Sequence, residues 1–294
     1  MTQRNLSFLG LEAEIDAYEN ATACILPVPF ERTTSYGKGT QAGPEAILRA
    51  SQYVELYDEE LGAAPCDMGI STLPPCVARA ADMAEALREI EDAARPPMED
   101  GKLVVVLGGE HSLTLAPVRA AHQVFGEIGV VQFDAHADLR ESYEGTPYSH
   151  ASVMRRIADD VGLPSFGVGI RSLSRREAEW LARDGRSVIW GHQLERAEEL
   201  FDVGLATLPE RVYLTFDLDF FDPSLLPATG TPEPGGGFWT PTMRLLRRLF
   251  ETKEVVAMDV VELAPAAAQP ASDFVAAKLV YKCLGYRRAA SRRG

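Results

Sequence analysis

The sequence predicts an α/β fold in which helices wrap one mainly parallel β-sheet. Short apolar runs rich in β-branched residues recur along the chain, and they lack the period-two alternation of half-exposed strands. Such runs are typical of strands that are buried on both faces. Longer amphipathic stretches lie between them, and this alternation of strand and helix is typical of a parallel sheet with crossover helices.

Each predicted strand is a run of apolar residues that ends at a polar residue or glycine. These strands are expected at 23–28, 103–107, 128–133, 166–170, 187–190, 212–216 and 255–261. The predicted helices carry an apolar face at helical spacing, and two of them open with start signals, Pro44 after Gly43 and the pair Ser272-Asp273. They are expected at 44–56, 78–94, 113–125, 175–182, 195–208, 242–251 and 272–284.

Length and composition are those of a folded protein with one large core. The chain has 294 residues, of which 46% are hydrophobic and 24% charged. Neither a low-complexity linker nor an internal repeat interrupts it, so a single domain over 1–294 is expected. The last residues, 287–294, are basic and polar, and we expect them to be frayed.

Charge and hydropathy exclude several classes of partner. The longest apolar runs are far shorter than the roughly 18 residues that span a bilayer, and the N-terminus lacks the pattern of a signal peptide, so the cytoplasm is the expected location. With 29 Lys and Arg against 43 Asp and Glu, the formal charge of −14 disfavours nucleic acid and anionic membranes. The same charge favours a cationic substrate or metal ions. The scattered cysteines are expected to be small buried hydrophobes; they are Cys24, Cys66, Cys76 and Cys283.

Polar side chains gather directly after several predicted strands, where ligands bind in open parallel sheets. Alternate side chains of an extended chain point to the same side, so neighbouring acidic residues and histidines should converge. The segments after the strands are Gly108-Gly109-Glu110-His111-Ser112, Asp134-Ala135-His136-Ala137-Asp138, Asp217-Leu218-Asp219 and Glu262.

These residues predict a metal centre. Buried carboxylates without a cation would each cost several kcal/mol, about 3 or more. A set of aspartates and neutral imidazoles without thiolates suits a divalent first-row ion such as manganese. Four aspartates and two histidines exceed the need of one ion, so we expect two ions about 3.5–4 Å apart, bridged by a hydroxide that acts as the nucleophile. A lone aspartate after a strand is usually a turn former or cap, but here His111, His136 and His150 accompany the aspartates. His122 and His192 lack such company and are expected to be surface residues or caps.

These segments, together with Thr229-Gly230-Thr231-Pro232-Glu233-Pro234-Gly235-Gly236, resemble the ordered motifs of the ureohydrolases, the arginase and agmatinase family. The resemblance runs from about Cys24 through 35–44 to Glu262 and the last helix. It implies a three-layer α/β/α arginase-like fold, two Mn²⁺ ions and hydrolysis of a guanidinium group to urea and an amine. It also implies a homo-oligomer, either a trimer or a hexamer.

Carried over position by position, the resemblance implies the same six metal ligands that spacing selects. They are His111, Asp134, His136, Asp138, Asp217 and Asp219. It implies that Glu262 binds the guanidinium group, that His150 carries a proton to the leaving amine, and that Thr231 lies near the guanidinium. Two positions depart from the family pattern. Glu110 stands where the family more often has Asp, and Ala151-Ser152 follow the histidine where many members have Gly-Thr or Gly-Met-Pro.

The expected substrate is a guanidine with an amine tail, agmatine or its N-aminopropyl derivative. Arginases typically carry Asn and a Ser-Gly-Asn segment that hold the amino acid head group, whereas this chain has Arg140 and Pro147-Tyr148-Ser149 at those positions. The segment from Thr231 to Gly236 is also agmatinase-like. Guanidinobutyrase and arginase activity remain alternatives within the family.

Two hypotheses come from other classes of protein. The glycine-rich segment 36–43 could bind a nucleotide, but its spacing is GxGxxxG rather than GxGxxG, and the acidic charge disfavours phosphate. It otherwise forms a turn before the helix at Pro44. A non-catalytic binding homologue would be indicated by loss of a metal ligand or of Glu262, and none is lost.

Overall fold

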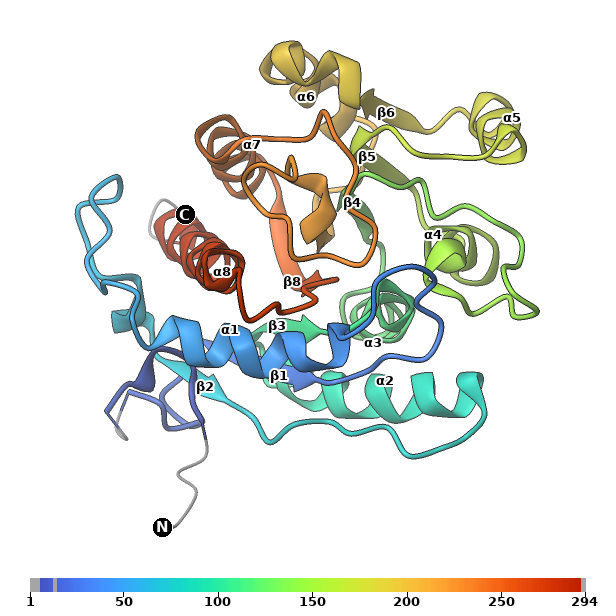
Figure 1. Ribbon diagram of the computed structural model, residues 1–294. Helices are drawn as coiled ribbons and strands as arrows, with labels where there is room; N and C mark the ends of the chain where they lie inside the picture. Colours follow the sequence, from blue (N-terminus) through green and yellow to red (C-terminus); the bar gives the residue numbers. More distant parts are fainter. Residues whose placement is uncertain (1–5, 13–14, 292–294) are drawn as a thin grey trace.

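The computed structural model describes residues 6–12 and 15–291, and an eight-stranded parallel sheet forms its centre (Figure 1). The strand order is β2-β1-β3-β8-β7-β4-β5-β6. The strands are β1 (Ala23–Val28), β2 (Ile70–Thr72), β3 (Leu103–Gly108), β4 (Gly129–Phe133), β5 (Ser165–Ile170), β6 (Ser187–Trp190), β7 (Arg211–Asp217) and β8 (Glu254–Val261). The predicted α/β class with a parallel sheet is therefore confirmed.

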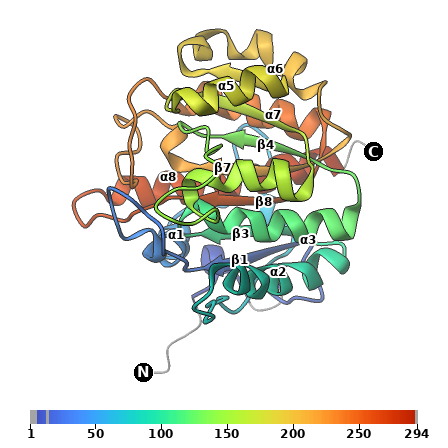
Figure 2. The same cartoon turned by 90° about the vertical axis from the view of Figure 1, so that its right-hand side faces the viewer.

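Helices cover both faces of this sheet and complete a three-layer arrangement. One face packs against α1 (Gly43–Ser51), α6 (Ala197–Leu205), α7 (Trp239–Thr252) and α8 (Pro270–Ser291). The other face packs against α2 (Met83–Glu99), α3 (Leu115–Phe125), α4 (Val153–Arg156) and α5 (Arg175–Asp184), of which α2, α3 and α5 lie toward the viewer in Figure 2. Among the described residues, no helix has both the length and the apolar character to cross a membrane.

Successive side chains of the central strands enter two different cores. In β3, Val105 and Leu107 belong to the core under α1 and α8, whereas Val104 and Val106 belong to the core under α2 and α3. All four are fully buried. Burial on both faces explains why this strand is a continuous apolar run in the sequence.

Several element bounds differ from the predicted ones. Strand β2 was not predicted, because three residues at a sheet edge give too short a pattern. Helix α2 begins at Met83 rather than 78, since the Asp82 side chain caps it by accepting a hydrogen bond from Glu85 N. The short helix α4 was also missed.

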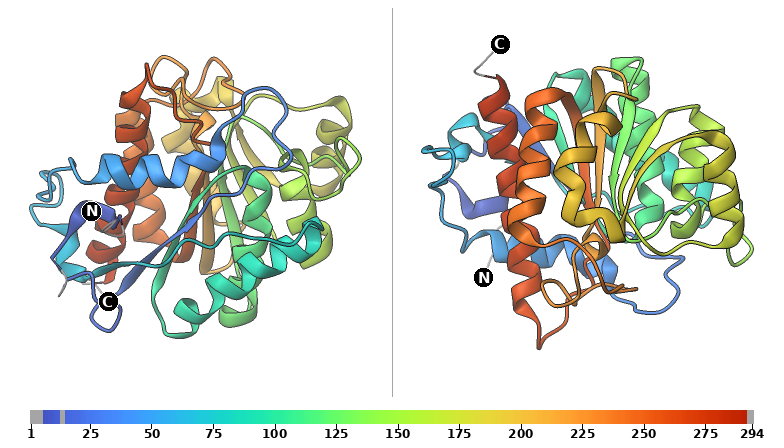
Figure 3. Two further views of the ribbon diagram at one scale, coloured as in Figure 1. Left: turned by 60° about the horizontal axis from the view of Figure 1, so that its bottom comes forward. Right: turned by 90° about the horizontal axis from the view of Figure 1, so that it is seen from above.

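The C-terminal tail is a correction to the prediction. Residues 287–291 were expected to be frayed, but α8 continues to Ser291, and residues 292–294 lie outside the described residues. Helix α8 runs beside α7 (Figure 3). Arg288 secures its last turns, because its guanidinium donates to Ala64 O and lies 3.0 Å from Asp67 Oδ2. Tertiary contacts therefore keep this segment helical, although its composition alone predicts fraying.

The cysteines follow the prediction in part. Cys24, Cys66 and Cys283 are buried, whereas Cys76 is partly exposed, and all four are free thiols.

Candidate metal centre and active site

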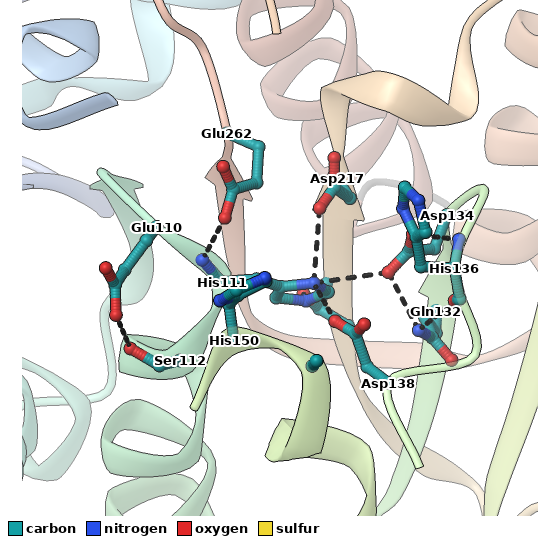
Figure 4. Close-up of polar contacts among 12 residues, drawn as sticks. Glu110, His111, Ser112, Gln132, Asp134, His136, Asp138, His150, Asp217 and Glu262 are labelled. Carbon is teal, nitrogen blue, oxygen red and sulfur yellow. Dashed lines mark hydrogen bonds and ion pairs between the residues drawn. The ribbon is translucent and has the colours of Figure 1, made fainter. Parts of the chain in front are cut away.

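The four polar strand ends lie on neighbouring strands. The sheet order places β3, β8, β7 and β4 side by side, so segments that are far apart in the sequence meet at one carboxyl edge. The side chains of His111, Asp138, Asp217 and Glu262 point toward a common space, whereas Glu110 points away from it toward Ser112 (Figure 4). This is the edge at which parallel sheets bind ligands.

The imidazole of His111 has one nitrogen that faces only acceptors. Its Nε2 lies 2.8 Å from Thr215 Oγ1, and that hydroxyl donates to Asp259 Oδ1 at 2.7 Å, so the ring donates its proton at Nε2. Nδ1 then carries a lone pair. It lies 3.1–3.3 Å from one oxygen of each of three aspartates and makes no hydrogen bond; they are Asp134, Asp138 and Asp217. A lone pair that faces three carboxylate oxygens is unfavourable, so this arrangement favours positive charge, a proton or a metal ion, at that position.

A second group of potential ligands adjoins the first. His136 Nδ1 lies 2.9 Å from Asp219 Oδ2 and 3.8 Å from Asp134 Oδ1. The donor atoms of His111, Asp134 and Asp217 form one group within 4.8 Å, and those of Asp134, His136 and Asp219 form another. Because the two groups share Asp134, they could hold two adjacent cations with a common carboxylate.

Burial and the negative charges of this cluster raise the pKa of some of its side chains, so that they bind protons more tightly when no cation is bound. Burial, with the nearby charges of Asp138 and Asp219, raises the pKa of Asp134 to about 7. Burial also raises the pKa of Asp217 well above its ordinary value. Burial alone would lower the pKa of His136, but the adjoining Asp219 carboxylate raises it to about 11. The cluster therefore attracts positive charge strongly, and its oxygen and imidazole donors are those that divalent first-row ions prefer.

Two residues outside the predicted set hold this cluster in shape. Gln132 Nε2 donates to Asp134 Oδ2 at 2.8 Å. The guanidinium of Arg171 donates to several main-chain carbonyls, including Asp219 O at 2.7 Å and Glu233 O at 2.8 Å. These bonds fix the loop after β7 relative to the loop that carries Thr231, whose hydroxyl lies 3.5 Å from Asp219 Oδ2.

Glu262 directly follows β8 in a strained conformation with its side chain buried. Its φ is 65°, which lies in the left-handed region that non-glycine residues rarely adopt. The predicted ligand Asp138 lies in the same region, with a φ of 51°. Glu262 Oε1 accepts a hydrogen bond from His111 N at 2.6 Å. Burial raises the pKa of this carboxyl well above its ordinary value. A cation bound beside it would favour the charged form.

One cavity of about 280 Å³ connects the predicted site residues. All of them except the fully buried Asp134 line it: His111, His136, Asp138, His150, Asp217, Asp219, Thr231 and Glu262. Arg140, Tyr143 and Glu177 also line it. His192 is exposed and His122 is partly exposed, and neither of them lines it.

The glycine-rich segment 36–43 does not offer a phosphate cradle. Its backbone amides at Gly39 and Gln41 donate to the Glu31 carboxylate at 3.0–3.1 Å. The Glu31 carboxylate therefore already occupies the N–H groups that a phosphate would need. The segment leads into α1, as the alternative interpretation expected.

Several residues that support the site were not predicted from the sequence, and they differ in whether the sequence pattern indicates them. Thr215 and Asp259 are polar residues within mainly apolar strands. A polar residue in such a strand indicates a buried hydrogen bond, so the sequence could have predicted this contact. Gln132 gives the same signal in β4. Thr33, whose hydroxyl lies 3.2 Å from His150 Nδ1, gives none, because it lies in a polar loop.

Comparison with known proteins identifies the relatives of this chain. The profile of the arginase family matches residues 21–285. The N(1)-aminopropylagmatine ureohydrolase of Synechocystis is 42% identical, over 95% of this chain and 93% of that protein. The agmatinase of Pyrococcus horikoshii is 35% identical, over 91% and 92%. The crystal structure of agmatine ureohydrolase of Thermoplasma volcanium has a TM-score of 0.85 at 32% identity, with 94% of this chain and 93% of that chain covered.

Proposed function

The chain belongs to the arginase family and is a ureohydrolase, and from this premise we propose that it hydrolyses the guanidinium group of agmatine or N-aminopropylagmatine. The products are urea and the free amine. The observation that carries the proposal is the unpartnered Nδ1 of His111, which faces three carboxylate oxygens in a cavity that also contains Glu262.

The proposed cofactors are two Mn²⁺ ions. Their proposed ligands are His111, Asp134, His136, Asp138, Asp217 and Asp219. Ions bound there would supply a water whose pKa is lowered toward neutrality. The ring of His111 is oriented to bind such an ion, because its Nε2–H donates a hydrogen bond to Thr215 Oγ1 and its Nδ1 has no hydrogen-bond partner.

Glu262 is the proposed anchor of the substrate guanidinium. One of its oxygens accepts from the His111 amide, which fixes the carboxylate and leaves the other oxygen free for a guanidinium N–H. A planar guanidinium facing a carboxylate makes the strongest charge-assisted contact available at neutral pH. Thr231 borders the same space, and His150 is the proposed carrier of the proton to the departing amine.

The amine tail of the substrate is supported by the acidity of the chain and by its relatives. The formal charge is −14, and the similar proteins named above act on agmatine or its aminopropyl derivative by name. The wall of the cavity includes Glu177, a carboxylate 4% exposed. It accepts from Leu139 N at 3.0 Å and from Ser174 N at 2.7 Å and lies 4.0 Å from Arg140 Nε, so its charge adds only a long-range attraction for a cationic tail.

One observation favours a second candidate, a guanidine with a carboxylate tail such as guanidinobutyrate. Arg140 lines the cavity and could pair with that carboxylate. Its guanidinium charge is, however, partly offset, because Nε lies 4.0 Å from Glu177 and the group stacks over Tyr143 at 4.9 Å. We therefore rank this substrate second.

Urea release after metal exchange tests the proposal. The purified protein would be stripped with a chelator and reloaded with Mn²⁺, Co²⁺ or Ni²⁺, and urea from agmatine, N-aminopropylagmatine and guanidinobutyrate would be measured. We expect no activity in the stripped protein, recovery with at least one ion, and the highest rate with Mn²⁺ and an amine substrate. Activity that survives complete removal of metal would contradict the proposal.

A further inference from the structure

The loop after β1 is fastened to the active-site edge by the buried carboxylate of Glu110. Its Oε2 accepts from Arg32 N at 2.5 Å and from Thr33 N at 2.6 Å. Its Oε1 accepts from the Thr33 hydroxyl at 2.8 Å and also from the Ser112 hydroxyl. The side chain is 0% exposed. Glu110 thus orients both the backbone and the side chain of Thr33.

The Thr33 hydroxyl joins Glu110 to His150. A hydroxyl has one proton to donate, and the carboxylate takes it, so the lone pairs of Thr33 Oγ1 remain for incoming donors. One such donor is His150 N at 3.0 Å, and the ring nitrogen Nδ1 lies 3.2 Å away. In this arrangement Nδ1 carries the ring proton and Nε2 carries the lone pair.

We infer that Thr33, held by Glu110, is a positioning residue for His150. It fixes the ring and the tautomer, so that Nε2 is the nitrogen available in the cavity; Ser35 Oγ lies 3.5 Å from that atom. Nε2 takes up a proton from solvent water in the cavity and passes it to the nitrogen of the departing amine, while Nδ1 keeps its own proton. This inference rests on the proposed function, in which His150 serves that amine.

Ser149 is the competing partner for the same ring. Its Oγ lies 3.3 Å from His150 Nδ1, but it also accepts from Ala151 N, as the cap of the short 3₁₀ helix that begins at His150. Thr33 makes a closer contact to the ring nitrogen, and it binds the backbone of His150 as well. A Ser149→Ala variant therefore separates the two partners.

The decisive experiment combines Thr33→Val with a His150→Ala background. Valine keeps the shape of threonine and removes the hydroxyl. We expect kcat to fall by about 10- to 100-fold, part of the 10²- to 10⁴-fold typical of general acid catalysis, with KM within about threefold. In the His150→Ala background the same substitution should change kcat by less than about twofold, because residues that act as a unit are not additive. Bound metal should be unchanged.

The control variants distinguish positioning from loop stability. Thr33→Ser restores the hydroxyl and should restore kcat to within about threefold. Thr34→Val removes the neighbouring hydroxyl, which bonds Glu31 at 3.3 Å rather than His150, and it should also stay within that range. Ser149→Ala should do the same.

The failing outcomes are separable. Wild-type protein that releases no urea from any guanidine defeats the proposed function. An active wild type defeats the inference alone if Thr33→Val keeps wild-type kcat, if it lowers kcat by the same factor with and without His150, or if Ser149→Ala has the larger effect. A His150→Ala variant with wild-type kcat also overturns the inference, whereas the proposed function is unaffected because urea is still released.

Discussion

His111 Nε2 lies 2.8 Å from the hydroxyl oxygen of Thr215, and Thr215 donates in turn to the buried carboxylate of Asp259 at 2.7 Å. Tyr213 donates to the other oxygen of Asp259 at 2.8 Å. These bonds run across the neighbouring strands β7 and β8 beneath the site. They determine which nitrogen of His111 is free to bind a cation.

Removal of this support should weaken metal binding. We predict that Thr215→Val lowers the affinity for the first-row ion by about 10- to 100-fold, the range typical of partners that orient a ligating histidine. Thr215→Ser keeps the hydroxyl and serves as the control. Competition with a chromophoric chelator measures both constants, and equal affinity in Thr215→Val and wild type would refute the prediction.

Loss of an aspartate from the cluster should remove both metal and activity. We predict that Asp134→Ala, which deletes the carboxylate shared by the two ligand groups, and Asp219→Ala each abolish urea release and lower the metal content. Elemental analysis of the purified proteins provides the measurement, with the exposed Asp202→Ala as the control. Wild-type protein that repeatedly contains no metal yet remains active would rule out this role.

Glu262→Gln should preserve the fold of the site and lose the anchor for the substrate. Breaking one side of a desolvated charge pair costs about 3–5 kcal/mol, so we predict that kcat/KM falls by about 10²- to 10⁴-fold for every guanidine. Glu198→Gln on the surface, where the side chain is 58% exposed and pairs with Arg244, is the control and should change kcat/KM by less than about threefold. Comparable rates for Glu262→Gln and wild type would exclude Glu262 as the anchor.

A separate cluster should make α8 sensitive to acid. The Glu60 carboxylate accepts from Lys282, Arg247 and Tyr286; although burial raises its pKa, these bonds lower it from 4.5 to about 2. The resulting stability is fully present above pH 4.5 and is lost as the pH falls through about 2. We predict that Glu60→Gln lowers the free energy of unfolding by about 1 kcal/mol at pH 7, since the group is partly exposed.

Denaturant unfolding of Glu60→Gln and wild type at pH 7 and pH 3 tests this prediction. The difference between the two proteins should shrink at the lower pH. A difference that is equal at both values would show that the carboxylate charge does not contribute.

The sheet was predictable from the sequence because its strands are buried on both faces. Strand β1 matches its predicted bounds, and the polar residues after β3, β4, β7 and β8 meet as expected. Contacts between distant segments were not predictable. Thr33 and Glu110 are 77 residues apart, and only the fold brings the hydroxyl and the carboxylate together. Arg288 likewise orders a tail whose composition indicated disorder.

The substrate preference tests the central claim most directly. The measurement is kcat/KM of the Mn²⁺-loaded protein for agmatine, N-aminopropylagmatine and arginine under one set of conditions. Arginine would bring a carboxylate into an acidic cavity in which the charge of Arg140 is partly offset by Glu177 at 4.0 Å, and an unpaired desolvated carboxylate is strongly disfavoured. We predict that the better amine exceeds arginine by at least about 10²-fold. A preference for arginine over both amines would contradict the assignment.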